Sequence, residues 1–145
     1  MDATLAEQVR VILAEVTRWA AERGDICAVA LVGSWARGAA RPDSDIDLVL
    51  LTPDPLRFRR DYGWITEINW VRIGASVAYW GDADYGPVWS RHLHLTDNTE
   101  IELGFSPPSW ASIDPLDAGT RQVIRDGCRI LFDPLGLLDQ LVRHT

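Results

Sequence analysis

The stretch from Ala28 to Leu51, AVALVGSWARGAARPDSDIDLVLL, constrains the fold of this chain more than any other part. An apolar run from Ile26 to Val32 ends at Gly33-Ser34, which is typical of a buried strand followed by a tight turn. A second apolar run covers Ile46 to Leu51 and begins among acidic residues. The stretch therefore predicts a strand, a glycine turn, a short connection and a second strand that carries carboxylates.

Two aspartates, Asp45 and Asp47, open the second strand with one residue between them. Because successive side chains of a strand point to opposite faces, both carboxylates project to one side, with Cα atoms roughly 6.6 Å apart, while Ile46 and Leu48 face the core. Two carboxylates so close repel each other and favour a neutralising cation. Oxygen ligands at this spacing suit Mg²⁺, which binds one or two carboxylates and completes its shell with water and phosphate.

The glycine turn before these aspartates has the chemistry of an anion site. Gly33 lets the backbone approach a ligand, and the N–H groups from Ser34 onward point at an anion held there. Phosphate fits that position, because Arg37 adds a donor fork and Ser34 a hydroxyl. A glycine turn or an acidic loop alone also fits an ordinary surface connection, so the prediction rests on their order and spacing.

Val32-Gly33-Ser34 followed by Asp45-Ile46-Asp47-Leu48 resembles the signature of the nucleotidyltransferase superfamily that includes DNA polymerase beta. The longer string from Gly33 to Gly38, with Ser44 to Leu48, resembles the small bacterial and archaeal minimal nucleotidyltransferases. The resemblance implies an α/β (α+β) nucleotidyltransferase fold. In this fold a mixed β-sheet has helices packed mainly on one face and an open face that bears carboxylates.

The resemblance further implies transfer of a nucleoside monophosphate from an NTP to a hydroxyl group, with release of pyrophosphate. Two Mg²⁺ ions, or Mn²⁺ instead, would be held by Asp45, Asp47 and a third carboxylate. The residues that would bind the nucleotide are Gly33, Ser34, Arg37 and Ser44.

The acceptor of the nucleotide stays open at this point. It is either a small molecule of the aminoglycoside type, in a cleft completed by a second copy of the chain as a homodimer, or a protein partner of the HEPN toxin type. The alternative without catalysis is an antitoxin-like binding module that neutralises such a HEPN-type partner by contact alone.

The third carboxylate is expected on the strand from Thr99 to Phe105, where polar and apolar residues alternate. This alternation places Glu100 and Glu102 on the open face, and periodicity cannot choose between them. The resemblance favours Glu102, which lies within the strand between Ile101 and Leu103, and leaves Glu100 as the alternative.

The turn before this strand determines which side chains face each other. A three-residue loop, 96–98, with its last residue in the left-handed region, keeps the apolar faces of the two strands together. This register brings His92 opposite Glu102 and His94 opposite Glu100. Both histidines then share the carboxylate face, where the pattern favours solvated polar side chains over metal ligands.

The rest of the chain predicts elements that complete a single nucleotidyltransferase domain over residues 1–145. Segment 81–87 carries two aspartates but lacks the other oxygen ligands of a calcium loop, so we interpret it as a solvated turn. Helices are expected over 4–23, 61–68, 118–125 and 135–143, and further strands over 71–79, 88–95 and 129–132.

The charge balance bears on possible partners. Against 21 acidic residues the chain has 14 basic ones, a net charge of −7, and no basic run of five. It therefore lacks the electropositive track of a nucleic-acid polymerase, and nucleic-acid binding is not expected. Arg57, Arg59 and Arg60 are interpreted as solvated charges around an apolar anchor, and Cys27 and Cys128 as small buried hydrophobes.

The sequence predicts neither a signal peptide nor a membrane span. Its first residues form an amphipathic, acidic pattern, and no apolar run approaches ~18 residues. We therefore expect a cytoplasmic protein without membrane contact.

Overall fold

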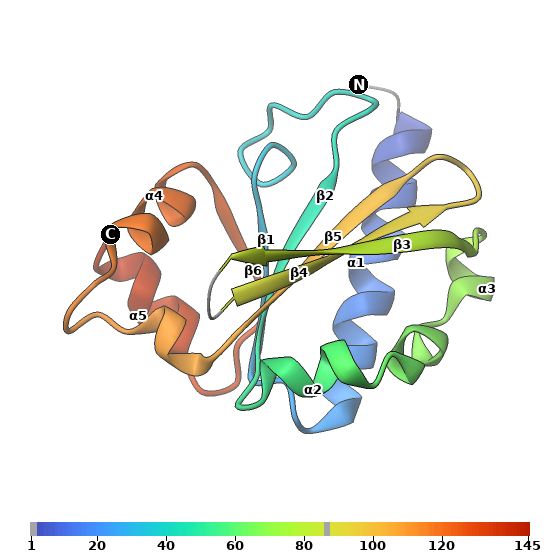
Figure 1. The fold of residues 1–145 in the computed structure, drawn as a ribbon. Helices are drawn as coiled ribbons and strands as arrows, with labels where there is room; N and C mark the ends of the chain where they lie inside the picture. The colour runs from blue at the N-terminus through green and yellow to red at the C-terminus, as the bar shows by residue number, and fades with distance from the viewer. Residues whose placement is uncertain (1–2, 86–87) are drawn as a thin grey trace.

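Residues 3–85 and 88–145 are described by a computed structural model. They form a six-stranded mixed sheet with the strand order β3-β4-β5-β2-β1-β6 (Figure 1). The central strands β2 (Ile46–Leu51) and β5 (Glu100–Ser106) run parallel, and every other neighbouring pair is antiparallel. The predicted mixed sheet of an α/β fold is confirmed.

Further strands and helices flank this central pair on both sides. The strands are β1 (Ala28–Val32), β3 (Val77–Tyr85), β4 (Val88–Leu95) and β6 (Cys128–Phe132). The helices are α1 (Ala3–Arg23), α2 (Pro55–Arg60), α3 (Trp70–Ile73), α4 (Ala118–Arg125) and α5 (Leu137–Arg143), with 3₁₀ turns η1 (Gly63–Glu67) and η2 (Pro108–Ala111).

Helix α1 covers one face of the sheet, as its helical spacing predicts. Val9, Ile12, Val16 and Trp19 repeat every three or four residues, and all four are buried. They share one apolar core with Ile46, Leu48 and Leu50 of β2 and with aromatic side chains of α2, η1 and β5. Because side chains of β2 alternate, burial of its apolar face in this core turns Asp47 to the opposite face of the sheet.

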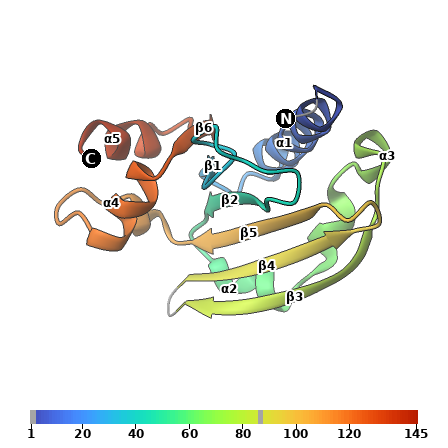
Figure 2. The same ribbon diagram turned by 90° about the horizontal axis from the view of Figure 1, so that it is seen from above.

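A second, smaller core lies on the carboxylate side of the sheet. There Ala28 and Ala30 of β1 and Leu51 of β2 are buried with Leu138 and Leu141 of α5, and α4 contributes to the same cluster. Figure 2 shows α4 and α5 together at one side of the molecule, away from α1 and α3. The carboxylate face is thus covered by helices near β1 and stays open farther along the sheet.

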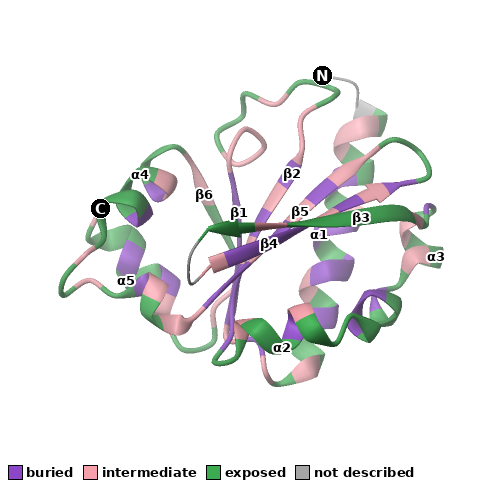
Figure 3. Cartoon of the chain, in the orientation of Figure 1, coloured by how far each residue is buried: buried purple, intermediate pink, exposed green. Residues whose placement is uncertain are grey.

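Strand β3 differs from the sequence expectation. The predicted strand over 71–79 is wrong at its start, because Asn69 accepts the N–H of Arg72 and opens α3, which Gly74 ends at φ 86°. The predicted solvated turn over 81–87 is wrong as far as Tyr85, since this part continues β3. Residues 86–87 lie outside the described ranges. Figure 3 shows β3 exposed along nearly its whole length, beside buried central strands.

The region after β2 also contains a helix that the sequence expectation missed. Asp54 accepts the N–H of Arg57 and Pro55 occupies the first turn of α2, a common helix start. The helix predicted over 61–68 is shorter, a 3₁₀ turn over 63–67. Helix α4 matches its prediction, and α5 begins at Leu137, because Gly136 is left-handed.

Neither cysteine forms a disulfide, and both thiols are partly buried. Burial raises the pKa of Cys27 and, together with the charge of Asp133, that of Cys128. Both therefore behave as small apolar residues beside the second core. None of the helices in the described ranges combines the length and apolar character that crossing a bilayer requires.

Candidate active site

The parallel pairing of β2 and β5 brings distant carboxylates together. Asp47 is the register partner of Glu102, and Asp45 lies just before β2 begins. On the other side of β5, His92 of β4 is also a register partner of Glu102. A row of ionisable side chains therefore crosses the three central strands on one face.

The turn between β4 and β5 has the predicted form. Asn98 is left-handed with φ 70°, and its N–H donates to the carbonyl of Leu95 at 3.1 Å. The N–H of Leu95 in turn donates to the carbonyl of Thr99 at 2.9 Å. The resulting register places His92 opposite Glu102 and His94 opposite Glu100, which confirms the prediction.

Three side chains of the row converge on one point. His92 Nε2 lies 3.2 Å from Asp45 Oδ2 and 3.7 Å from Glu102 Oε2. One ligand atom from each residue lies within 4.8 Å of the other two. Ser90, which the sequence reasoning missed, donates its hydroxyl to Glu102 Oε1 at 2.9 Å. Asp45, His92 and Glu102 are 34%, 31% and 25% exposed, so a ligand can reach them from solvent.

Asp47 is the most strongly perturbed acid of the row. Burial is the main cause that raises its pKa to about 7, and the interaction with Glu102 and the charge of Asp45 add to it. Its Oδ1 atom is buried and has no hydrogen-bond partner. A partly buried carboxylate beside other acids, with one buried and orphaned oxygen, is the environment that a bound cation would relieve. The residues present therefore fit a divalent metal ion.

A second row lies beside the first. The pKa of Glu100 is raised, first by its hydrogen bond with Asp45 and then by burial, while His94 opposes the shift. His94 Nδ1 lies 3.0 Å from Glu100 Oε1, and the His94 ring stacks on Tyr79 with a centroid distance of 4.2 Å. Glu100 thus contacts Asp45, while Glu102 lies beside both Asp47 and His92.

Gly33 faces Asp47 directly. Its φ of 76° is left-handed, and a Cβ added there would lie 2.7 Å from Asp47 Oδ2. The glycine therefore makes room for the carboxylate, a reason different from the expected approach of the backbone to phosphate. The N–H groups of Ala36 and Arg37 donate to the Gly33 carbonyl at 3.1 and 3.2 Å. These two N–H groups are therefore not available to an anion, and the donors of this turn that can bind one are the N–H groups of Ser34 and Trp35.

Arg37 and Ser44 belong to the same loop, and the contacts that they make stabilise the conformation of this loop. Arg37 is exposed, and its backbone packs on Gly127, where an added Cβ would lie 2.9 Å from Arg37 Cβ. Ser44 Oγ accepts the N–H of Arg41 at 2.8 Å, and the Ser44 carbonyl accepts Trp35 Nε1 at 3.3 Å. The structure thus brings Asp45, Asp47 and Glu102 together, with Arg37 and Ser44 in the loop above them.

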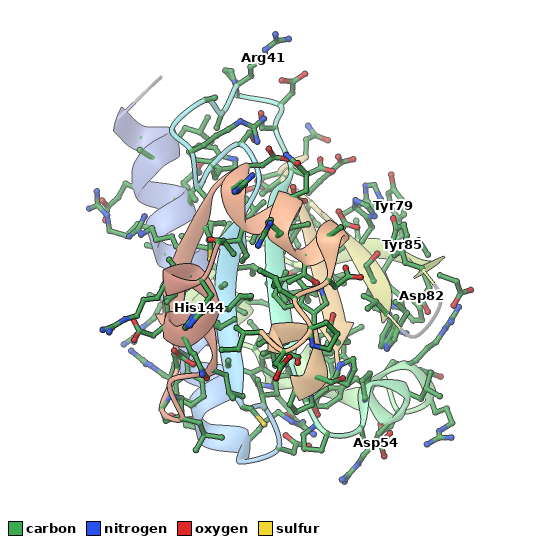
Figure 4. The ribbon with its side chains drawn as sticks, turned by 90° about the vertical axis from the view of Figure 1, so that its left-hand side faces the viewer. Arg41, Asp54, Tyr79, Asp82, Tyr85 and His144 are labelled. Carbon is green, nitrogen blue, oxygen red and sulfur yellow. The ribbon has the colours of Figure 1, made fainter. Side chains whose placement is uncertain are left out.

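The arginines of α2 lie away from this site. Arg41 of the loop and Asp54 at the start of α2 mark opposite ends of the molecule in Figure 4. Arg59 pairs with Asp84 of β3 and lies 3.7 Å from Asp82. These contacts link α2 to β3 and engage Arg59 with the acids of that strand.

Comparisons with known proteins agree with this geometry. Residues 14–75 match the family model described as nucleotidyltransferase domain, a range that holds Gly33, Asp45 and Asp47. The crystal structure of an aminoglycoside 6-adenyltransferase from Bacillus subtilis has a similar fold, with a TM-score of 0.50 at 14% sequence identity. The similarity covers 72% of this chain and 36% of that enzyme. A comparison with curated protein sequences finds no match. The family match thus covers residues 14–75, less than half of the chain, and the fold is similar to that of the adenyltransferase.

Proposed function

We propose that this protein transfers a nucleoside monophosphate from an NTP to a hydroxyl group and releases pyrophosphate. The observation that carries the proposal is the group of Asp45, Asp47 and Glu102 on one open sheet face, directly after the Gly33 turn. Phosphoryl transfer depends on positioning and charge neutralisation more than on covalent chemistry by the protein. The three carboxylates, through a bound cation, and the N–H donors of the adjacent turn supply both the positioning and the charge neutralisation.

Each residue of the group has a role in this proposal. Asp45, Asp47 and Glu102 would hold Mg²⁺, which when bound lowers the pKa of the acceptor hydroxyl and neutralises charge on the leaving group. Ser90 fixes one oxygen of Glu102 and so orients the carboxylate. The N–H groups of Ser34 and Trp35 would donate to the phosphates of the NTP.

We infer that the acceptor is a small molecule. The net charge of −7 disfavours a polyanion and attracts a cationic acceptor. The adenyltransferase with the similar fold is named for an aminoglycoside substrate, which supports this class. A cavity of about 550 Å³ between β4, η2 and α4 has the size of a small-molecule site and is lined by Val88, Trp110 and Asp117, among others.

This cavity lies on the carboxylate face. Val88 shares a strand face with Ser90 and His92, because side chains of β4 alternate. Helix α4 packs on the same side in the second core. We therefore place the acceptor between the carboxylate group and α4.

The reaction is tested with ATP and GTP labelled at either the α- or the γ-phosphate, incubated with Mg²⁺ and a host lysate. Transfer of a nucleoside monophosphate puts the α-label on the acceptor and the γ-label in pyrophosphate. The variant carrying both Asp45→Asn and Asp47→Asn is the control without transfer. Separating small molecules from proteins assigns the acceptor class.

Other outcomes contradict the proposal in distinct ways. A γ-label on the product would indicate a kinase. An α-label on a protein would replace the small-molecule acceptor with a protein partner. NTP binding without any transfer would support the binding module that acts by contact.

A further inference from the structure

His92 occupies a position between two carboxylates that come from different strands. Its Nε2 atom is the ring atom that faces Asp45 Oδ2, at 3.2 Å, and Glu102 Oε2, at 3.7 Å. On its other side the register partner on β3 is Gly81, around which an added Cβ would meet nothing within 4 Å. The Nε2 atom of His92 thus faces the acids, and the position beside it on β3 carries no side chain.

The separations within this trio fit ligands of one ion. Two atoms that each lie about 2.1 Å from an ion are about 3.0 Å apart at an octahedral angle and about 3.4 Å apart at a tetrahedral one. The observed separations of 3.2 and 3.7 Å need only small side-chain movements to reach these values. Asp47 lies two residues after Asp45, as the register partner of Glu102, and its buried, unpartnered Oδ1 leaves a further oxygen beside the trio.

We propose that His92 is a ligand of the divalent cation held by Asp45 and Glu102, and that it makes the site prefer Mn²⁺ and Zn²⁺ over Mg²⁺. Imidazole nitrogen binds first-row transition-metal ions well, whereas Mg²⁺ prefers oxygen ligands. The inference shares its metal site with the proposed function, but it does not require nucleotide transfer.

The neighbouring histidine gives a matched control. His94 lies two residues away on the same face, and its ring centroid is 6.2 Å from that of His92. Its Nδ1 pairs with Glu100 at 3.0 Å, and its ring stacks on Tyr79. His94 therefore shares the environment of His92 but stands outside the trio.

The test measures Mn²⁺ binding by electron paramagnetic resonance on the full chain without nucleotide, and Mg²⁺ binding by competition. In the wild type we expect nitrogen-14 coupling to bound Mn²⁺ in the spin-echo spectrum. His92→Ala should remove this coupling and weaken Mn²⁺ at least about tenfold, while Mg²⁺ affinity changes less than about threefold. His94→Ala should keep the coupling.

Equal losses of Mn²⁺ and Mg²⁺ affinity in His92→Ala, or coupling that persists in it, would overturn the inference. His92→Gln repeats the measurement with a polar side chain, should the alanine variant fail to fold. Asp45→Asn separates this inference from the proposed function. If Asp45→Asn leaves Mn²⁺ binding unchanged, the shared metal site is wrong. If the wild type binds the cation through His92 and transfers no nucleotide, only the proposed function fails.

Discussion

Asp47 carries its charge in a place that disfavours it, because burial, Glu102 and Asp45 all raise its pKa, to about 7 from an ordinary 3.8. Between these two values the folded protein binds more protons than the unfolded chain. The free energy of unfolding therefore falls as the pH rises from about 4 to about 7, and the whole penalty is present above pH 7. Above pH 7, the metal-free protein therefore carries the full destabilisation that the charge of Asp47 causes.

Asp47→Asn should remove this destabilisation, since the amide keeps the shape of the side chain and carries no charge. We expect the thermal midpoint of the metal-free variant to exceed that of the wild type by about 3 °C at pH 8 and by less at pH 5. Thermal unfolding with a chelator, at pH 5 and at pH 8, checks this. The same midpoint difference at both pH values would contradict the raised pKa.

Glu102 and Glu100 form a second test at the level of single residues. Glu102 is the register partner of Asp47 and lies near His92, whereas Glu100 pairs with His94. We expect Glu102→Gln to abolish nucleotide transfer and to weaken Mn²⁺ at least about tenfold, and Glu100→Gln to impair both less. An active Glu102→Gln protein beside an inactive Glu100→Gln one would show that the third carboxylate is Glu100.

At the scale of elements, strand β3 is held to the rest of the sheet by a buried arginine. Arg91 of β4 is fully buried and donates to both carboxylate oxygens of Asp82, at 2.7 and 3.0 Å. Its guanidinium lies 4.0 Å from the ring centroid of Trp80. These contacts on one face of β3 anchor an otherwise exposed strand.

Removing the partner of a buried charge should therefore detach this strand. Asp82→Ala leaves Arg91 buried without a counter-ion and should lower the free energy of unfolding by about 3 kcal/mol. Asp84→Ala is the matched control two residues along β3, since its pair with Arg59 lies in solvent. Chemical denaturation of both variants measures the difference. Equal effects would show that burial of Arg91 contributes little.

The sequence predicts most elements whose signals are local. Asp117 starts α4 where the sequence predicts it, and the alternation around Glu102 predicts β5, whereas α5 starts two residues later than predicted, after the left-handed Gly136. The second half of β3 could not be predicted in this way, because Asp82 and Asp84 look like a solvated turn until Arg91 and Arg59 neutralise them. Those arginines come from elsewhere in the chain, so tertiary contacts decide the outcome.

In the candidate site, too, local sequence patterns predict some features, and long-range contacts decide the others. The motif around Asp45 and Asp47 and the loop before Glu102 are short-range patterns, so the residues and their register could be predicted. The pairing of β2 with β5 is long-range, and it alone shows that Asp47 faces Glu102. The distance of His92 from Asp45 also depends on the pairing of β2 with β5. Because this pairing is not visible in the sequence, the sequence favoured a solvated histidine.

At the scale of the whole molecule, every basic side chain other than histidine is an arginine, and acids exceed arginines by 21 to 14. A triphosphate therefore approaches a protein of its own charge sign and needs a cation to bridge them. We expect calorimetric titration to show ATP or GTP binding with Mg²⁺ and at least about tenfold weaker binding without it. Asp45→Asn and Asp47→Asn should each lose the Mg²⁺-dependent part. Unchanged binding in both variants would contradict the site.

The parallel pairing of β2 with β5 also determines when the site can form during folding. The chain between these strands includes α2, η1, α3, β3 and β4, so the loop that brings Asp47 to Glu102 is long. Contacts of such high sequence separation form slowly, because the entropy of closing the loop is lost before they stabilise the protein. A fragment ending at β2 would hold both aspartates of the motif without the third acid. Cation binding therefore reports on the completed sheet, and a cation added during refolding would slow unfolding more than it speeds folding.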